Sequence, residues 1–179
     1  MIFSLTVLGC SSALPSTERG QSAQLLNIRD QLFLLDCGEG TQLQLKKNGV
    51  KIQHINHIFI SHLHGDHYFG LIGLISTLHL LGRKKELHVY GNPDLENIIN
   101  VQLKASNTKL LYPLIFHPLH YNLPEIILEN DELTVQTILL KHTIPSCGFL
   151  FREKERERNI NKEIVHQVKI PFSEFEKIK

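Results

Sequence analysis

Short hydrophobic runs divided by Gly, Pro, Ser and Asp dominate the beginning of the chain. Residues 2–8, 23–28 and 32–35 have the length and the content of apolar side chains that are typical of short strands. Because only short breaks divide these runs, we expect the three strands to follow one another as a meander.

Helical and extended patterns alternate along the rest of the chain. An apolar spacing that starts at residue 41 and ends at Asn48 and Gly49 predicts a short helix with a glycine stop. Residues 69–81 are apolar on nearly every side, which predicts a helix buried against a sheet, and another helix is predicted at residues 94–104. The remaining predicted strands are residues 58–60, 87–90, 114–116, 126–128, 133–140 and 148–151. This alternation predicts an α/β fold in which helices flank a sheet.

Length and composition indicate a single soluble unit. With 179 residues, 42% of them hydrophobic, the chain can bury a full core. No hydrophobic run approaches the length of a membrane span, and residues 1–5 lack the basic region of a signal peptide. Cys10, Cys37 and Cys147 have no paired spacing, which fits reduced thiols better than a disulfide framework. We therefore expect a cytoplasmic protein that does not bind a membrane.

Four potential metal ligands lie within six residues, directly after the apolar run at residues 58–60: His62, His64, Asp66 and His67. Imidazole suits zinc, and a carboxylate so close can ligate a second metal or hold a proton beside metal-bound water. A sequence of this composition would produce such a cluster by chance roughly once in a thousand chains. The alternative is that the histidines cap strand ends or hydrogen-bond to one another. The cluster favours metal-assisted hydrolysis.

The spacing of the cluster predicts how its side chains converge. Residues two apart in an extended stretch point the same way, so His62 and His64 can approach one ion together. Gly65 permits a sharp turn, after which Asp66 and His67 can point back to the same region. Because one ion cannot easily use all four ligands, we expect two ions, on the order of 3.5 to 4 Å apart, that share an activated hydroxide.

Residues 62–67 match the signature of the metallo-β-lactamase superfamily, and three further segments narrow the resemblance. Residues 8–15, 35–42 and 68–71 resemble ribonuclease Z, the tRNA 3′-processing endonucleases, and the likeness continues to about Phe151. The resemblance implies the metallo-β-lactamase fold, with layers in the order αββα. It also implies a zinc-dependent endoribonuclease that removes the 3′ trailer from precursor tRNA, leaves a 3′-hydroxyl on the tRNA and forms a homodimer. The net charge of +1 neither supports nor excludes an RNA partner, so the RNA prediction depends on the resemblance.

His142 is the best candidate for a third zinc imidazole, because it follows the predicted strand at residues 133–140 and precedes a break in the pattern. Ribonuclease Z carries a metal-binding His in a similar context. The implied arrangement places one zinc on His62, His64 and His142 and a second zinc on Asp66 and His67. Asp66 is also expected to orient and deprotonate the attacking water, which makes it the predicted catalytic residue.

Other polar residues have open or less specific roles. Asp36 lies where a strand stops and a helix begins, so it can accept a hydrogen bond from a ligating imidazole or cap the helix. The same acceptor chemistry serves both roles, and both stay open. The remaining histidines are expected to be surface or partly buried polar residues: His54, His57, His79, His88, His117, His120 and His166.

The end of the chain differs from the ribonuclease Z pattern, which includes a bridging Asp and a further His from later in the sequence. We therefore expect residues 1–151 to be the N-terminal portion of the catalytic fold, with a weakened site for the second metal. Residues 152–179 carry eight basic and six acidic side chains. Charge alone favours a solvated hairpin or helix face, whereas the resemblance implies a protruding arm, or a truncated insertion, that contacts tRNA.

Two alternative functions follow from these differences. The chain could be another metallo-β-lactamase-fold hydrolase that acts on a small phosphodiester or ester, although residues 36–42 argue against it. It could also be an inactive fragment that binds RNA or dimerises, which the absent ligands favour.

Overall fold

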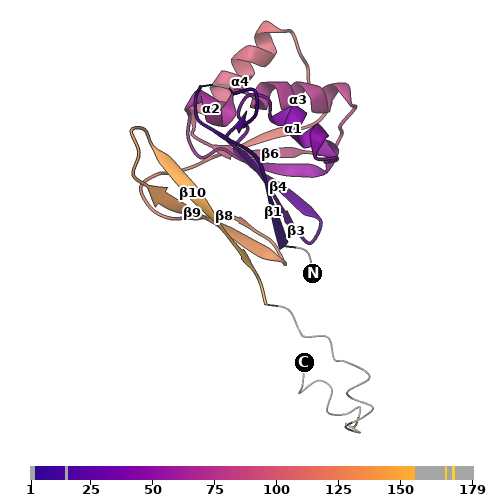
Figure 1. Ribbon diagram of the computed structural model, residues 1–179, viewed down its shortest axis with the longest axis vertical. Helices are drawn as coiled ribbons and strands as arrows, with labels where there is room; N and C mark the ends of the chain where they lie inside the picture. The colour runs from indigo at the N-terminus through magenta and orange to yellow at the C-terminus, as the bar shows by residue number, and fades with distance from the viewer. Residues whose placement is uncertain (1–2, 15, 156–167, 169–170, 172–179) are drawn as a thin grey trace.

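Two β-sheets face each other in the computed structural model, which describes residues 3–14, 16–155, 168 and 171 (Figure 1). In this part of the chain the first sheet has seven strands in the order β2-β1-β3-β4-β5-β6-β7, and the second has three in the order β10-β9-β8. The strands of the first sheet are β1 (Phe3–Ser11), β2 (Gly20–Gln21), β3 (Ala23–Ile28), β4 (Gln31–Leu35), β5 (Ile55–Phe59), β6 (Leu87–Gly91) and β7 (Leu114–Pro118). Those of the second are β8 (Ile126–Glu129), β9 (Leu133–Leu140) and β10 (Ser146–Glu153).

The first sheet changes from antiparallel to parallel pairing at β4. Strands β1, β3 and β4 pair antiparallel, which confirms the predicted meander, whereas β4, β5, β6 and β7 run parallel. The short strand β2, parallel to β1, is not predicted from the sequence because two residues carry no periodicity. Leu35 at the end of β4 pairs with Phe59 at the end of β5. Residues that follow these two strands therefore start from the same edge of the sheet.

Helices cover one face of the first sheet (Figure 1). They are α1 (Thr41–Lys47), α2 (Gly65–Tyr68), α3 (Leu71–Leu80) and α4 (Asp94–Ala105), with a 3₁₀-helix at Ile52–His54. The helix predicted at residues 69–81 is observed as α3, two residues shorter at its start and one at its end, whereas the short helix α2 was not predicted. Gly70 lies between these two helices, and its N–H donates to the carbonyl of Cys37 at 2.9 Å. This hydrogen bond joins the junction of α2 and α3 to the loop that follows β4.

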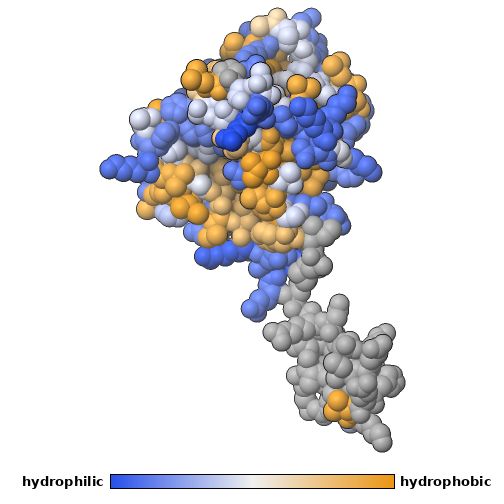
Figure 2. Space-filling model, in the orientation of Figure 1, coloured by the Kyte–Doolittle hydropathy of each residue, from blue (hydrophilic) through white to orange (hydrophobic). Residues whose placement is uncertain are grey.

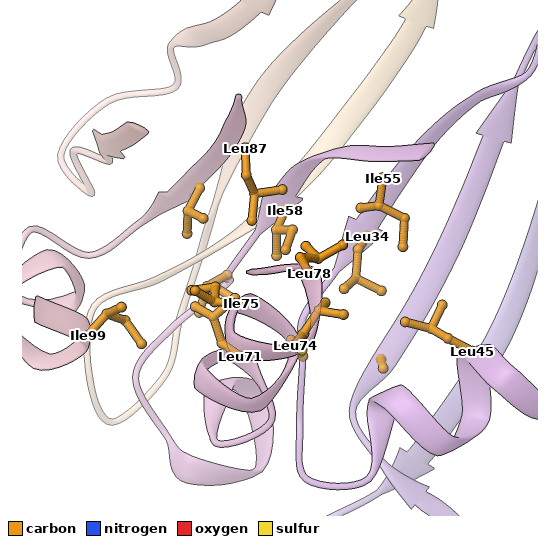
Figure 3. Packing of buried hydrophobic residues seen from close by; sticks show 14 of the residues in the cluster. Leu34, Leu45, Ile55, Ile58, Leu71, Leu74, Ile75, Leu78, Leu87 and Ile99 are labelled. Carbon is orange, nitrogen blue, oxygen red and sulfur yellow. The ribbon is translucent and has the colours of Figure 1, made fainter. Parts of the chain in front are cut away.

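The core between the helices and the sheet depends on α3. Leu71, Leu74, Ile75 and Leu78 are fully buried, and Figure 3 shows their side chains in the same cluster as those of the sheet strands. Complete burial of one such side chain contributes roughly 1.5–3 kcal/mol to stability. The apolar sequence of α3 therefore anchors the segment that immediately follows the histidine cluster.

The second sheet packs on the opposite face of the first. Strands β8, β9 and β10 are antiparallel to their neighbours, and their apolar side chains meet Phe33, Phe59 and Tyr90 in a second core. The rings of Phe59 and Tyr90 are stacked with their centroids 4.5 Å apart. The fold is the expected mixed α/β sandwich, with three of the four predicted layers present in the described part of the chain.

Strand β10 extends beyond the boundary predicted at Phe151. Arg152 and Glu153 pair with residues of β9, and Glu153 forms an ion pair with Arg29 at 2.8 Å. Most of the predicted arm at residues 152–179 lies outside the described residues.

Hydrophobic side chains also reach the surface over the sheets. Phe3, Leu5 and Val7 are more than half exposed on β1, and Leu5 pairs with Leu26, which belongs to the core between the sheets. Figure 2 shows hydrophobic residues gathered over the sheets, below the helical layer. No helix in the described part of the chain is long and apolar enough to cross a membrane.

Candidate metal centre

A hollow of about 740 Å³ lies at the edge of the first sheet where β4 and β5 end. Its wall also includes residues from the loop between β9 and β10. All five predicted ligands line it: His62, His64, Asp66, His67 and His142.

Three imidazoles converge inside this hollow. Nε2 of His62 lies 3.1 Å from Nδ1 of His64, and Nε2 of His142 lies 3.2 Å from the same Nδ1. One nitrogen from each ring lies within 4.8 Å of the other two. His62 and His64 come from the extended segment after β5, as their spacing predicts, whereas His142 comes from the loop between β9 and β10. Three imidazole nitrogens at this separation are a donor set suited to zinc.

Asp66 and His67 lie beside this group, on the short helix α2. Nε2 of His67 is 3.6 Å from Oδ2 of Asp66, and the ring of His67 lies 4.0 Å from that of His62, measured between centroids. The group of close potential ligand atoms found among the described residues consists of His62, His64 and His142 and does not include Asp66 or His67. The assignment of Asp66 and His67 to a second ion stays a prediction.

The carboxylate of Asp36 accepts hydrogen bonds from three residues around the site. Its Oδ2 accepts hydrogen bonds from Nδ1 of His67 at 2.7 Å and from the hydroxyl of Ser22 at 3.1 Å. Its Oδ1 accepts from the backbone N–H of Ser61 at 2.9 Å. Helix α1 begins after Gly40 and has no side-chain cap. Of the two roles left open by the sequence, the structure therefore favours contact with a predicted ligand over capping.

The environment of the imidazoles shifts their pKa values in opposite directions. Burial, together with the neighbouring His67, lowers the pKa of His62 to about 4, so this ring is neutral near pH 7. Burial alone would also lower the pKa of His67, but the hydrogen bond to Asp36 and the charges of Asp36 and Asp66 raise it. A neutral ring is the form that can donate a lone pair to a metal.

Two glycines allow the loop after β4 to pack directly against α2. A Cβ on Gly38 would lie 2.2 Å from the carbonyl oxygen of Asp66, and one on Gly70 would lie 2.2 Å from the carbonyl oxygen of Gly38. The N–H of Cys37 donates to the carbonyl of His67 at 2.7 Å. These close approaches give a physical reason for glycine at both positions.

Sequence reasoning missed the role of Ser61 and Ser22 in holding Asp36. Serines are common at strand ends and in loops, so neither has a local signal that separates it from an ordinary turn residue. The adjacency of Ser61 to His62 is the one feature of the sequence that could have drawn attention to it.

Three histidines that were expected to be surface or partly buried polar residues are partly buried, and they lie together in a second cluster. His57 and His88 are paired residues on β5 and β6, and their rings stack at 4.9 Å. Nδ1 of His88 lies 2.9 Å from Nε2 of His117 on β7. Burial, with the charges of His88 and His117 next, lowers the pKa of His57 to about 4. The pairing of three parallel strands creates this cluster, and no local spacing predicts it.

Comparisons with known proteins cover most of the chain. A family model described as Anti-Pycsar protein Apyc1 matches residues 3–161. Ribonuclease Z of Bacteroides fragilis is 48% identical over 177 residues, which are 99% of this chain and 58% of that protein. Ribonuclease Z of Porphyromonas gingivalis is 42% identical over 173 residues, which are 97% of this chain and 57% of that protein. The chain thus spans less than three fifths of the length of these curated relatives.

Solved structures agree with the sequence matches. The crystal structure of human tRNase Z, short form, superposes with a TM-score of 0.77 and is 35% identical, covering 84% of this chain and 64% of the human chain. A metallo-β-lactamase-fold protein of Bacillus subtilis has a TM-score of 0.62 at 23% identity, covering 83% of this chain and 57% of that chain. The second likeness supports the fold alone.

Proposed function

This chain belongs to the family that the Anti-Pycsar protein Apyc1 model describes and is a homologue of bacterial ribonucleases Z, and on that premise we propose that it carries the metal-binding part of a tRNA 3′-processing endoribonuclease. One observation carries the proposal. Imidazoles of His62, His64 and His142 converge within 4.8 Å at the edge of the first sheet, although His142 comes from the loop between β9 and β10 of the second sheet. Their convergence supports a metal site, because ring nitrogens from two separate segments meet at one place, as the ligands of a zinc ion do.

The donor set supports zinc as the metal. We assign His62, His64 and His142 to one ion, and Asp66 and His67 to a second, whose ligand set is smaller within this chain. When bound, zinc ions would polarise the phosphodiester and lower the pKa of a nearby water. The hydrogen bond from His67 to Asp36 leaves Nε2 of His67 directed toward Asp66, which is consistent with a second ion there.

Asp66 is the proposed catalytic residue. Its carboxylate lines the hollow and has Oδ2 3.6 Å from Nε2 of His67, so an oxygen of Asp66 faces the same space as the imidazoles. In the proposed reaction Asp66 holds the attacking water in line with the scissile bond and accepts its proton. Cleavage would leave a 3′-hydroxyl on the tRNA and a 5′-phosphate on the trailer.

The experiment uses a chimaera, because the chain spans 58% of its Bacteroides fragilis relative. Residues 1–151 would replace the matching part of that ribonuclease Z, and cleavage of a 3′-extended tRNA precursor would be followed with added zinc or manganese. We expect the chimaera to cleave the precursor and His64→Ala to abolish cleavage. His54→Ala, on an exposed histidine of the 3₁₀-helix, is the matched control. Activity that survives His64→Ala would contradict the metal assignment.

A second candidate is hydrolysis of a small phosphodiester or ester. The description of the matching family model is not a ribonuclease name, which is the observation that favours it. An aryl phosphodiester in the same assay separates the two functions. Cleavage of that ester without cleavage of precursor tRNA would support the second candidate.

Partners and location complete the proposal. Precursor tRNA is the proposed partner, residues 152–179 the proposed arm that contacts it, and homodimerisation follows the resemblance. Cys10, Cys37 and Cys147 are all free thiols, which supports a reducing compartment such as the cytoplasm. Sedimentation of this chimaera and of a second one that also carries residues 152–179 of this chain, each alone and with tRNA, measures both association and RNA binding.

A further inference from the structure

The hydroxyl of Ser61 lies between a carboxylate and two proposed metal ligands. Its Oγ is 3.1 Å from Oδ2 of Asp36, 2.9 Å from Nδ1 of His62 and 3.3 Å from Nδ1 of His67. The serine backbone is held on both sides, because its N–H donates to Asp36 at 2.9 Å and its carbonyl accepts from the N–H of Cys147 at 3.2 Å. With its backbone fixed, Ser61 places its hydroxyl between Asp36 and the two imidazoles.

Counting hydrogens decides which atom donates in this network. Nδ1 of His67 lies 2.7 Å from Oδ2 of Asp36, so that nitrogen carries the hydrogen and Nε2 of His67 keeps its lone pair. The Ser61 hydroxyl has a single hydrogen and two competing acceptors, the Asp36 carboxylate and Nδ1 of His62. A carboxylate is the stronger acceptor, since hydrogen bonds to charged groups are about twice as strong as neutral ones.

Once Ser61 donates to Asp36, its oxygen can only accept from His62. Nδ1 of His62 must then carry a hydrogen, and Nε2 keeps the lone pair. That Nε2 is the atom that lies 3.1 Å from Nδ1 of His64, within the group of three imidazoles. In the opposite arrangement Ser61 would donate to His62, and the hydrogen of that ring would occupy the nitrogen that faces the site.

We propose that Ser61 is a positioning residue that extends the orienting effect of Asp36 to His62. One carboxylate then sets the tautomer of an imidazole in each proposed metal group, His67 by direct contact and His62 through the serine hydroxyl. The inference rests on the proposed metal centre for its functional meaning. Its physical content, which nitrogen of His62 carries the hydrogen, can be measured on the metal-free chain.

The first test is nitrogen-15 NMR of the histidine rings in the metal-free chain near pH 7. We expect His62 to hold its hydrogen on Nδ1 in the original chain and to become a mixture of tautomers in Ser61→Ala. Ser61→Thr keeps a hydroxyl and should keep the Nδ1–H tautomer. Ser22→Ala is the matched control, because it removes a hydroxyl at the same 3.1 Å from Oδ2 of Asp36 without a contact to His62.

The second test is zinc affinity of the same variants by competition with a chelator. Removal of a group that orients a ligating histidine typically weakens metal binding by roughly 10- to 100-fold. We expect a loss in that range for Ser61→Ala, a smaller loss for Ser22→Ala and recovery in Ser61→Thr. Intact folding of each variant is verified by circular dichroism.

Each outcome has a separate meaning. A His62 ring that carries its hydrogen on Nε2, or a tautomer that is the same in Ser61→Ala as in the original chain, overturns the inference. Failure of the original chain to bind zinc contradicts the proposed function instead, and the NMR result then still decides the role of Ser61.

Discussion

Nδ1 of His67 lies 2.7 Å from Oδ2 of Asp36, although the two residues are 31 positions apart in the chain. Asp36 follows β4, whereas His67 lies on α2 beyond the end of β5. Because β4 and β5 are parallel neighbours, the segments that follow them leave the sheet at the same edge. The contact therefore joins the loop after one strand to the helix after the next.

Asp36→Asn tests this contact directly. An amide oxygen accepts a weaker hydrogen bond than a carboxylate, so the ring of His67 loses both a strong acceptor and a nearby negative charge. We expect the pKa of His67 to fall and zinc affinity to decrease by roughly 10- to 100-fold. NMR titration and chelator competition measure the two effects, with Asp94→Asn at the start of α4 as the control.

Gly70→Ala should destabilise the chain. The added Cβ would lie 2.2 Å from the carbonyl oxygen of Gly38, so backbone has to move, and overpacking of this kind costs about 1–3 kcal/mol. Gly73→Ala, within helix α3, is the matched control. A Cβ on Gly73 would have the flexible side chain of Gln42 as its nearest neighbour, at 3.3 Å. There the expected change is a gain of up to about 1 kcal/mol, from the better helix propensity of alanine. Urea denaturation of both variants measures the difference, and equal stabilities would contradict the close packing of the loop against α2.

Zinc should stabilise the folded chain, since a ligand that binds only the folded state adds RT ln(1 + [L]/Kd), or about 2.7 kcal/mol at a hundredfold excess over Kd. Among the three imidazoles, that of His142 comes from the loop between β9 and β10, the other two from the segment after β5. His142→Ala should therefore remove most of the rise in melting temperature that zinc produces. His120→Ala, on an exposed residue outside the hollow, should leave the rise unchanged. A chelator should reverse the effect in the original chain.

Acid should destabilise the metal-free chain through two histidines, the partly buried His57 and the buried His62. Burial lowers the pKa of His57 and that of His62 to about 4, from the ordinary 6.5. Between pH 6.5 and 4 the unfolded chain binds more protons at these rings than the folded chain does. The contribution of these two rings to the free energy of unfolding is present in full above pH 6.5 and is lost as the pH falls toward 4.

His57→Gln isolates one of the two contributions and leaves the proposed metal ligands intact. We expect a shallower fall of the unfolding free energy between pH 6.5 and 4 than in the original chain. The exposed His54 supplies the control His54→Gln. Identical pH dependence in His57→Gln and the original chain would show that His57 is not titrating as its burial requires.

The sequence alone determined most elements and the local half of the site. Strand β9 was predicted at residues 133–140 and is observed at Leu133–Leu140, because alternating and aliphatic runs directly reflect burial on a sheet. His62 and His64 were expected on one side of an extended stretch, and their ring nitrogens do approach each other at 3.1 Å. Both results depend on neighbours in the chain, which the sequence shows.

Tertiary structure decided everything that depends on register between distant segments. It brought His142 to His64 across 78 positions, and it favoured hydrogen bonding to His67 over helix capping as the role of Asp36. The same strand pairing collected His57, His88 and His117 into a cluster that no spacing indicates. The physical reason is that hydrophobic periodicity reports which face of an element is buried, whereas the partner of a polar atom is set by which strands pair and in what register.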